Sequence, residues 1–103
     1  MAYKVFITEV TQENYDSCVS YVQYVLHQGK AAKDIKEQYD RFVENVSQFP
    51  EMYPKIPDER LINSNYRRAL IKNYVVVYEF DGEAVTIHGF YHQLQDYARF
   101  VNL

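Results

Sequence analysis

Hydrophobic side chains change their spacing along the chain, and the changes predict a strand, two helices and then further strands. Near the amino terminus apolar residues alternate with polar ones, which predicts a short strand over residues 3–7. In the next two segments apolar side chains recur every three or four positions, as on the buried face of a helix. The first stripe comprises Tyr15, Cys18, Val19, Val22, Val25 and Leu26, and the second comprises Ala32, Ile35, Tyr39, Phe42, Val43, Val46 and Phe49. Because only a short break separates the two helices, we expect them to form an antiparallel hairpin.

Local signals predict where these helices begin and end. Thr11 offers a hydroxyl that accepts from the free amides at the start of the first helix. Gly29 tolerates the left-handed conformation that is common at a helix end, so we expect the first helix to stop there. Pro50 stops the second helix, and the three prolines between Pro50 and Glu59 predict a rigid loop.

The rest of the chain has the pattern of strands. Residues 66–71 and 74–80 are rich in β-branched and aromatic side chains, with a turn expected at residues 72–73. Asp81-Gly82 is the strongest turn signal, because a type I′ turn needs positive φ at both central positions and this pair tolerates it. It predicts a hairpin that joins residues 74–80 to residues 83–91, and helical spacing then predicts a short final helix with Leu94, Tyr97, Ala98 and Val101.

These elements together predict an α+β fold in a single domain over residues 1–103. The order is an amino-terminal strand, an antiparallel helical hairpin, an antiparallel β-meander and a short carboxy-terminal helix. With a two-residue turn, one face of the meander would carry Tyr74, Val76, Tyr78, Val85 and Ile87. The other face would carry Val75, Val77, Thr86, His88, Phe90 and His92. The first set is the more apolar, so we expect it to face the helices and the second set to form an open face.

Composition is typical of one soluble globular domain. Of 103 residues, 48% are hydrophobic and 17% aromatic, with three glycines and three prolines, which argues against disorder. The longest uncharged apolar run, residues 74–78, is far shorter than the ~20 residues of a membrane span, and residues 1–8 lack the apolar stretch of a secretory signal. We therefore expect a cytoplasmic protein. A lone Cys18 forms neither an intrachain disulfide nor a thiolate metal site, and we expect no metal or cofactor.

The formal charge of −3 argues against a protein that binds nucleic acid on its own, because phosphate contacts normally need a basic excess. One segment departs from this average, since residues 60–73 hold four bases and no acid: Arg60, Arg67, Arg68 and Lys72. On charge alone, a solvated edge strand explains this segment better than a binding site does.

The order and spacing of these residues resemble the RelE/ParE superfamily of bacterial toxins. The resemblance rests on the run Tyr66–Tyr78, on Asp81-Gly82, Val85, Ile87, His92 and Asp96, and in the front half on Tyr21, Ala31-Ala32 and Phe49-Pro50. It covers nearly the whole chain. It implies the toxin of a type II toxin–antitoxin (plasmid stabilisation) system, held in a heterocomplex by an antitoxin whose tail wraps it.

The superfamily has two branches, and the resemblance leaves both open. RelE-like members are mRNA interferases that cut messenger RNA on the ribosome, whereas ParE-like members poison DNA gyrase. RNA cleavage needs a proton acceptor, a proton donor and a cation beside the phosphate. By resemblance, His92 would be the general acid or base and Arg67 or Arg68 would stabilise the phosphate. Tyr91 and Lys72 would contact the RNA, Tyr91 by stacking on a base.

The sequence also departs from the ribonuclease pattern. Val75 stands where RelE-like enzymes tend to carry an arginine, and residues 93–95 are not basic. His88 lies four strand residues from His92, about 13 Å away, which is too far for a shared metal ion. Ion pairing for the arginines and ordinary packing for Tyr91 are therefore kept as alternatives, and so is a toxin-like binding module with no activity.

Overall fold

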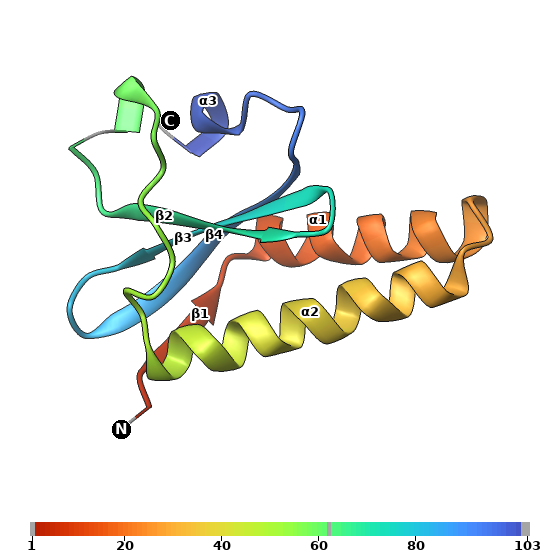
Figure 1. Ribbon diagram of the computed structural model, residues 1–103, viewed down its shortest axis with the longest axis horizontal. Helices are drawn as coiled ribbons and strands as arrows, with labels where there is room; N and C mark the ends of the chain where they lie inside the picture. The colour runs from red at the N-terminus through yellow and green to blue at the C-terminus, as the bar shows by residue number, and fades with distance from the viewer. Residues whose placement is uncertain (1, 62, 102–103) are drawn as a thin grey trace.

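A helical hairpin packs against one face of a four-stranded sheet in the computed structural model, which describes residues 2–61 and 63–101 (Figure 1). The α+β class predicted from the sequence is confirmed. The elements in chain order are β1 (Lys4–Ile7), α1 (Glu9–Ser20), the π-helix η1 (Tyr21–Val25), α2 (Gly29–Gln48), the 3-10 helix η2 (Glu59–Leu61), β2 (Tyr66–Ile71), β3 (Tyr74–Phe80), β4 (Ala84–His92) and α3 (Tyr97–Val101).

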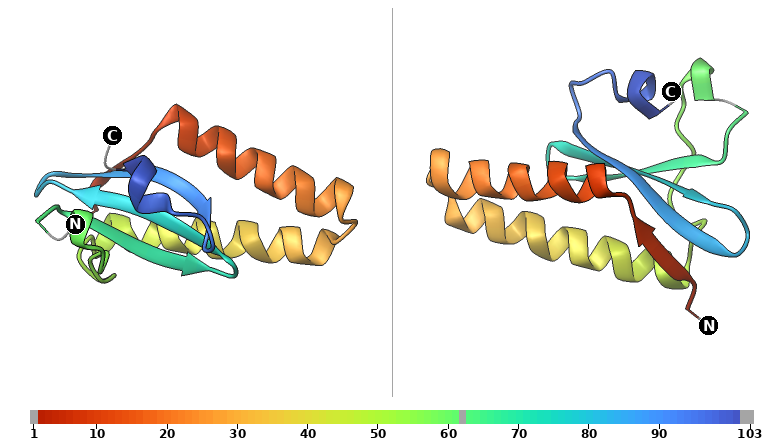
Figure 2. Two further views of the ribbon diagram at one scale, coloured as in Figure 1. Left: turned by 90° about the horizontal axis from the view of Figure 1, so that it is seen from above. Right: turned by 180° about the vertical axis from the view of Figure 1, so that it is seen from behind.

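The strands lie in the order β1-β4-β3-β2, so the first strand of the chain pairs with the last (Figure 2). β3 runs antiparallel to both β2 and β4, as the predicted meander requires. β1 instead runs parallel to β4 and pairs only with its first half, from Lys4↔Ala84 to Ile7↔Ile87. The second half of β4 is therefore an edge of the sheet.

The main core lies between the helical hairpin and the sheet. The two helical stripes bury Val19, Val22, Ala32, Ile35, Tyr39, Phe42 and Val46 against the sheet residues Ala69, Ile71, Val76, Tyr78, Val85, Ile87 and Phe90. Tyr78 is fully buried, and its hydroxyl donates to the carbonyl of Pro50 at 2.7 Å, which ties the end of α2 to the sheet. This packing confirms the helical period, and α2 ends just before Pro50 as predicted. Phe49, the last residue of the predicted second stripe, is exposed because it follows the end of α2.

The opposite face of the sheet is not open, and on this point the sequence-based expectation is wrong. A second, smaller core forms there around Val75 and Val77, covered by Ile56 and Leu61 from the loop after α2 and by Ala98 from α3. In Figures 1 and 2 this loop and α3 lie on the side of the sheet away from the hairpin. The apolar character of the β3 run on both faces is the physical reason, because each face needs cover.

A β-bulge in β4 overturns the predicted facing of its last residues. Tyr78 pairs with Ile87 but Val77 pairs with Gly89, so His88 is an extra residue in β4. An extra residue reverses which face each later side chain takes. Phe90 therefore turns to the helix side, and His92 lies opposite Tyr74 on that side instead of on the predicted open face.

The cap of the first helix is one turn earlier than expected. Thr8 is the N-cap, and its hydroxyl oxygen accepts from the amide of Thr11 at 3.3 Å. Thr11 itself is fully buried and donates its hydroxyl to the carbonyl of Ile87 at 3.2 Å. The predicted role of Thr11 is wrong because its side chain joins α1 to β4.

The residues that take a positive φ also differ from those expected in the two turns. Gly29 begins α2 instead of ending α1, and the turn between the helices takes its positive φ of 55° at His27. In the β3–β4 turn, Asp81 accepts backbone hydrogen bonds from Glu83 and Ala84, and positive φ is confined to Gly82. This differs from the predicted type I′ turn, which needs positive φ at both Asp81 and Gly82.

Two stretches predicted to be helical and apolar have other environments. Val25 and Leu26 are exposed at the hairpin tip, and Leu94 precedes α3 and is exposed. The side chain of Val101 lies outside the described part of the structure. None of the described helices combines the length and apolar character needed to cross a membrane.

Candidate functional site

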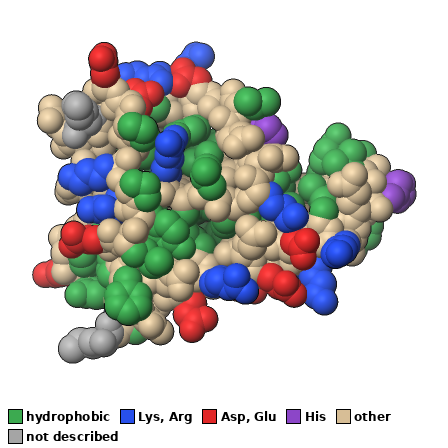
Figure 3. Space-filling view, viewed as in Figure 1, with side chains coloured by type: hydrophobic (Ala, Val, Ile, Leu, Met, Phe, Trp, Pro, Cys, Tyr) green, Lys and Arg blue, Asp and Glu red, His purple; other side chains and the backbone are tan. Residues whose placement is uncertain are grey.

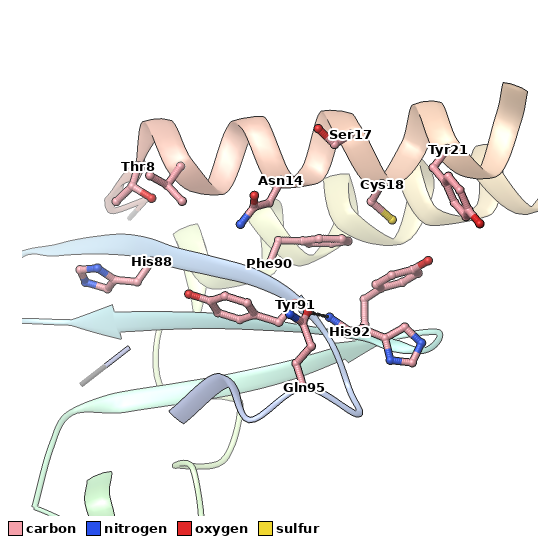
Figure 4. A pocket seen from close by; sticks show the side chains of 12 residues that line it. Thr8, Asn14, Ser17, Cys18, Tyr21, His88, Phe90, Tyr91, His92 and Gln95 are labelled. Carbon is pink, nitrogen blue, oxygen red and sulfur yellow. Dashed lines mark hydrogen bonds between the residues drawn. The ribbon is translucent and has the colours of Figure 1, made fainter. Parts of the chain in front are cut away.

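A cleft of about 930 Å³ lies between α1 and the second half of β4 (Figure 4). It begins where β1 ends, because the chain leaves the sheet at Thr8 and turns into α1. Phe90 and Tyr74 form an apolar base, and α1 forms the opposite wall. The lining residues are Thr8, Val10, Asn14, Ser17, Cys18, Tyr21, Tyr74, His88, Phe90, Tyr91, His92 and Gln95.

The backbone of β4 forms one side of this cleft. The amide of Gln93 donates to the carbonyl of Asn73 at 2.8 Å, toward the β2–β3 side of the sheet. Because backbone groups alternate along a strand, those of Phe90 and His92 point the other way, into the cleft. The side-chain oxygen of Gln95 accepts from the amide of His92 at 2.9 Å and so occupies one end of this edge, as Figure 4 shows.

A thiol and a phenol meet inside the cleft. The side chains of Tyr74 and Cys18 are hydrogen-bonded, and this bond, with burial, raises the pKa of Tyr74 to about 12. Burial raises the pKa of Cys18, although the hydrogen bond from Tyr74 acts against this. A thiol with a raised pKa is mostly protonated near neutral pH, so Cys18 is a weak nucleophile there.

His92 lies at the end of β4, on the cleft side. Its ring meets the ring of Tyr74 edge-on, with 5.6 Å between centroids. The Nδ1 atom accepts from the amide of Leu94 at 3.1 Å, so in the neutral ring the proton is assigned to Nε2. The His92 side chain therefore stabilises the turn that follows β4.

The two arginines are engaged elsewhere. Arg67 lies on the helix side of β2, and its guanidinium donates to the carbonyl of Tyr53 at 2.7 Å and to that of Glu51 at 3.3 Å. Arg68 points to the other face and donates to the hydroxyl of Tyr97 in α3. Both arginines thus fasten segments that cover the sheet.

The two expected RNA contacts lie apart as well. Lys72 sits in the β2–β3 turn, with its ammonium 3.5 Å from the carboxylate of Asp34 on α2. Tyr91 is half-buried, and its ring stacks on Tyr97 at 6.3 Å between centroids. Burial raises the pKa of Tyr91.

The structure does not bring the candidate catalytic residues together. Arg68 is in register with Gly89 through Val77, three residues from His92 along β4, which is about 10 Å. Its side chain also lies on the opposite face from His92. The expectation that His92 lies on an open face is wrong, because the bulge at His88 turns its side chain to the helix side of the sheet. Their catalytic roles stay predictions.

Comparison with known proteins bears on the family. Residues 5–97 match the family described as "ParE toxin of type II toxin-antitoxin system, parDE". The chain belongs to this ParE toxin family. A solved structure titled "Chromosomal ParDE TA system from P. aeruginosa" has a similar fold, with a TM-score of 0.62 and 18% identity over 88% of this chain and 96% of that one. A search of curated proteins gives no match.

In this ParE-family chain an ion-pair cluster links two segments that sequence reasoning left apart. Arg60 donates to both carboxylate oxygens of Asp96, including Nη1 to Oδ2 at 3.0 Å, and to Asp58 at 2.8 Å. Hydrogen bonds from Arg60 lower the pKa of Asp58 to about 2. The cluster holds the start of α3 against the loop. No local pattern signals it, because Arg60 and Asp96 are distant in sequence.

The sequence pattern also did not predict that α1 would form one wall of the cleft. Asn14 and Ser17 lie on the polar side of the helical stripe, which by itself indicates only solvent exposure. They become candidate contacts because β1 is short and leaves the edge of β4 beside them. The ParE-family chain thus has a cleft between α1 and β4, whereas its candidate catalytic groups are dispersed.

Proposed function

We propose that this chain is a growth-inhibiting toxin that acts by binding DNA gyrase, not by cutting RNA. The observation that carries the proposal is the separation of His92 from the arginines. Each of the three side chains already has a partner within the fold: Leu94 for His92, Tyr53 for Arg67 and Tyr97 for Arg68. Acid–base cleavage needs these groups around one phosphate.

Expression in bacteria with labelled thymidine and labelled amino acids separates the two mechanisms. We expect DNA synthesis to fall before protein synthesis, and the purified protein to inhibit supercoiling by gyrase. His92→Gln keeps a polar side chain and leaves the Arg67 contacts intact, so we expect growth inhibition within about twofold of the parent. Early arrest of translation that His92→Gln abolishes would favour the ribonuclease. A folded parent with no effect on growth would favour the inactive module.

We also propose that the cognate antitoxin places an extended segment in the cleft between α1 and β4. The second half of β4 supports this, because β1 does not pair with it. Its backbone groups at Phe90 face the cleft and can form the hydrogen bonds of an added strand. The apolar base at Phe90 and Tyr74 supplies pockets for alternate side chains of such a segment.

The single cysteine makes this second proposal testable without a substitution. Cys18 lines the cleft, so bound antitoxin should slow its alkylation by a maleimide at least tenfold. A control in the Cys18→Ser background carries Lys36→Cys on the exposed face of α2, where we expect no protection. Equal protection at both positions, or at neither, would contradict binding in the cleft.

A further inference from the structure

The far end of the helical hairpin carries a cluster of exposed apolar side chains. Tyr21, Tyr24, Val25 and Leu26 are 52%, 67%, 60% and 43% exposed. Figure 1 shows that the hairpin extends well beyond the sheet, and hydrophobic side chains gather at its end in Figure 3. We call residues 21–33 the hairpin tip. None of the strands in the described residues lies beneath it to cover these side chains.

A π-helix presents these side chains to solvent. In the tip the amide of Leu26 donates to the carbonyl of Tyr21 at 3.0 Å, and the amide of Gln28 donates to that of Val22 at 3.0 Å. The wider turn breaks the stripe after Val22, which is the last buried residue of α1 and η1. His27 then takes a positive φ of 55°. π-helical turns are rare and occur often at functional sites, so this geometry is unusual for a mere connection.

The charge of the tip is opposite to that of the whole protein. Between Asp16 and Asp34 the sequence has no carboxylate, but it has Lys30, Lys33 and His27. Lys33 makes one exposed ion pair, 4.0 Å long, with Glu37, and such pairs hold little energy. The tip is thus apolar and basic on a chain of net charge −3. A matching surface has an apolar groove bordered by carboxylates.

The exposed area of the tip indicates whether it binds a second copy of the chain or a different protein. A stable interface buries about 800 Å² on each side. Four side chains that each expose about half of their surface present only a few hundred Å², too little for two tips to hold a dimer. A few protruding tyrosines and aliphatic side chains suffice as the anchors of an interface when they enter a pocket.

We propose that the hairpin tip inserts into an apolar, acid-bordered groove of the target protein that this toxin inhibits. The inference rests on the proposed function and deepens it, because it assigns target binding to a surface distinct from the cleft. Tyr24 and Val25 are the anchors, and Lys30 contributes the complementary charge. Tyr21 lies where the tip and the cleft meet.

The test uses two tip variants and one control in the full chain. Tyr24→Ser with Val25→Ser removes the anchors, and Lys30→Glu reverses a charge without removing apolar surface. The control Leu70→Thr changes a side chain of β2 that is 62% exposed. All sites are exposed, so we expect unchanged circular dichroism. We expect each tip variant to lose at least tenfold in growth inhibition and in inhibition of gyrase supercoiling, and the control to match the parent. Antitoxin protection of Cys18 should not change.

Each other result has a definite meaning. A parent that does not arrest growth would overturn the proposed function, and the inference with it. A toxic parent whose tip variants are equally toxic would overturn the inference alone. Loss of Cys18 protection in the tip variants would assign the tip to the antitoxin. A fall from dimer to monomer would assign it to a second copy, and parent co-sedimentation with phosphatidylglycerol vesicles would assign it to lipid. Any of these three would also overturn the inference.

Discussion

At Gly89 the ring of Tyr91 fills the space that a side chain would need. A Cβ atom added to Gly89 would lie 2.1 Å from Cε2 of Tyr91. The ring lies there because residues two apart share a face of β4, and from that position it stacks on Tyr97 of α3. The glycine therefore lets an aromatic ring join the strand to the helix that covers it.

We predict that Gly89→Ala destabilises the protein by about 1–2 kcal/mol, since the methyl group must displace the Tyr91 ring from Tyr97. Urea denaturation measures the free energy of unfolding. Gly29→Ala is the matched control, because nothing lies within 4 Å of its added Cβ and it begins a helix. We expect the control to be neutral or slightly stabilising. Equal effects at both glycines would mean that the Tyr91 contact has no energetic weight.

At the scale of elements, α3 is held by few contacts, and the ion pairs of Arg60 are prominent among them. Asp96 directly precedes α3, and Asp58 lies in the loop across from it. The hydrogen bonds from Arg60 lower the pKa of both carboxyl groups, to about 2 for Asp58. A carboxyl group with a depressed folded-state pKa stabilises the fold above its ordinary pKa, and this contribution is lost as the pH falls through the depressed value.

We predict that α3 loosens between about pH 4 and pH 2 while the sheet stays folded. The backbone NMR signals of Tyr97–Val101 should move toward unfolded values in that interval, before those of β3. Arg60→Gln should show the loosened signals already at pH 6, and high salt should act in the same direction because the pairs are exposed. Signals of α3 that do not change down to pH 2 would contradict this role.

Features of a single segment could be predicted from the sequence, whereas features of paired strands could not. Helices and strands were found because their apolar periods depend on one segment at a time. The bulge at His88 is a property of two paired strands, and so the facing of Phe90 and His92 was predicted wrongly. For the same reason His92 was wrongly placed on an open face. The parallel pairing of β1 with β4 cannot be predicted from local patterns either, because the two strands are far apart in the sequence. The prediction that Thr11 caps α1 was wrong because its hydroxyl donates to the carbonyl of Ile87 in a distant strand.

Across the whole molecule, buried tyrosines carry much of the core. Tyr15 stacks on Tyr39 at 4.2 Å between centroids, and both rings meet Phe90 edge-on. Burial raises the pKa of Tyr15 and of Tyr39 to about 12, and it does the same for Tyr78. A raised folded-state pKa means that the stability from the neutral phenols is complete below about pH 10 and is lost as the pH rises through 12.

We predict that the folded protein loses stability steeply between about pH 10 and pH 12. Phenolate absorbance in the native protein should lag behind that of the urea-unfolded protein, and the lag should end when the circular dichroism changes. Tyr39→Phe should weaken this pH dependence at little cost in stability, because its hydroxyl has no hydrogen-bond partner among the described residues. Tyr78→Phe, which loses its bond to Pro50, should cost about 1 kcal/mol. Coincident phenolate curves for native and unfolded protein would contradict the prediction.

The pairing of β1 with β4 has a consequence for synthesis on the ribosome. The first strand has no partner until the last one has been translated, so a nascent chain that lacks β4 leaves β1 and the inner face of α1 exposed. Contacts between such distant segments also form slowly. A polypeptide truncated before β4 should therefore not fold, and the cleft between α1 and β4 forms only after the whole sheet has been translated.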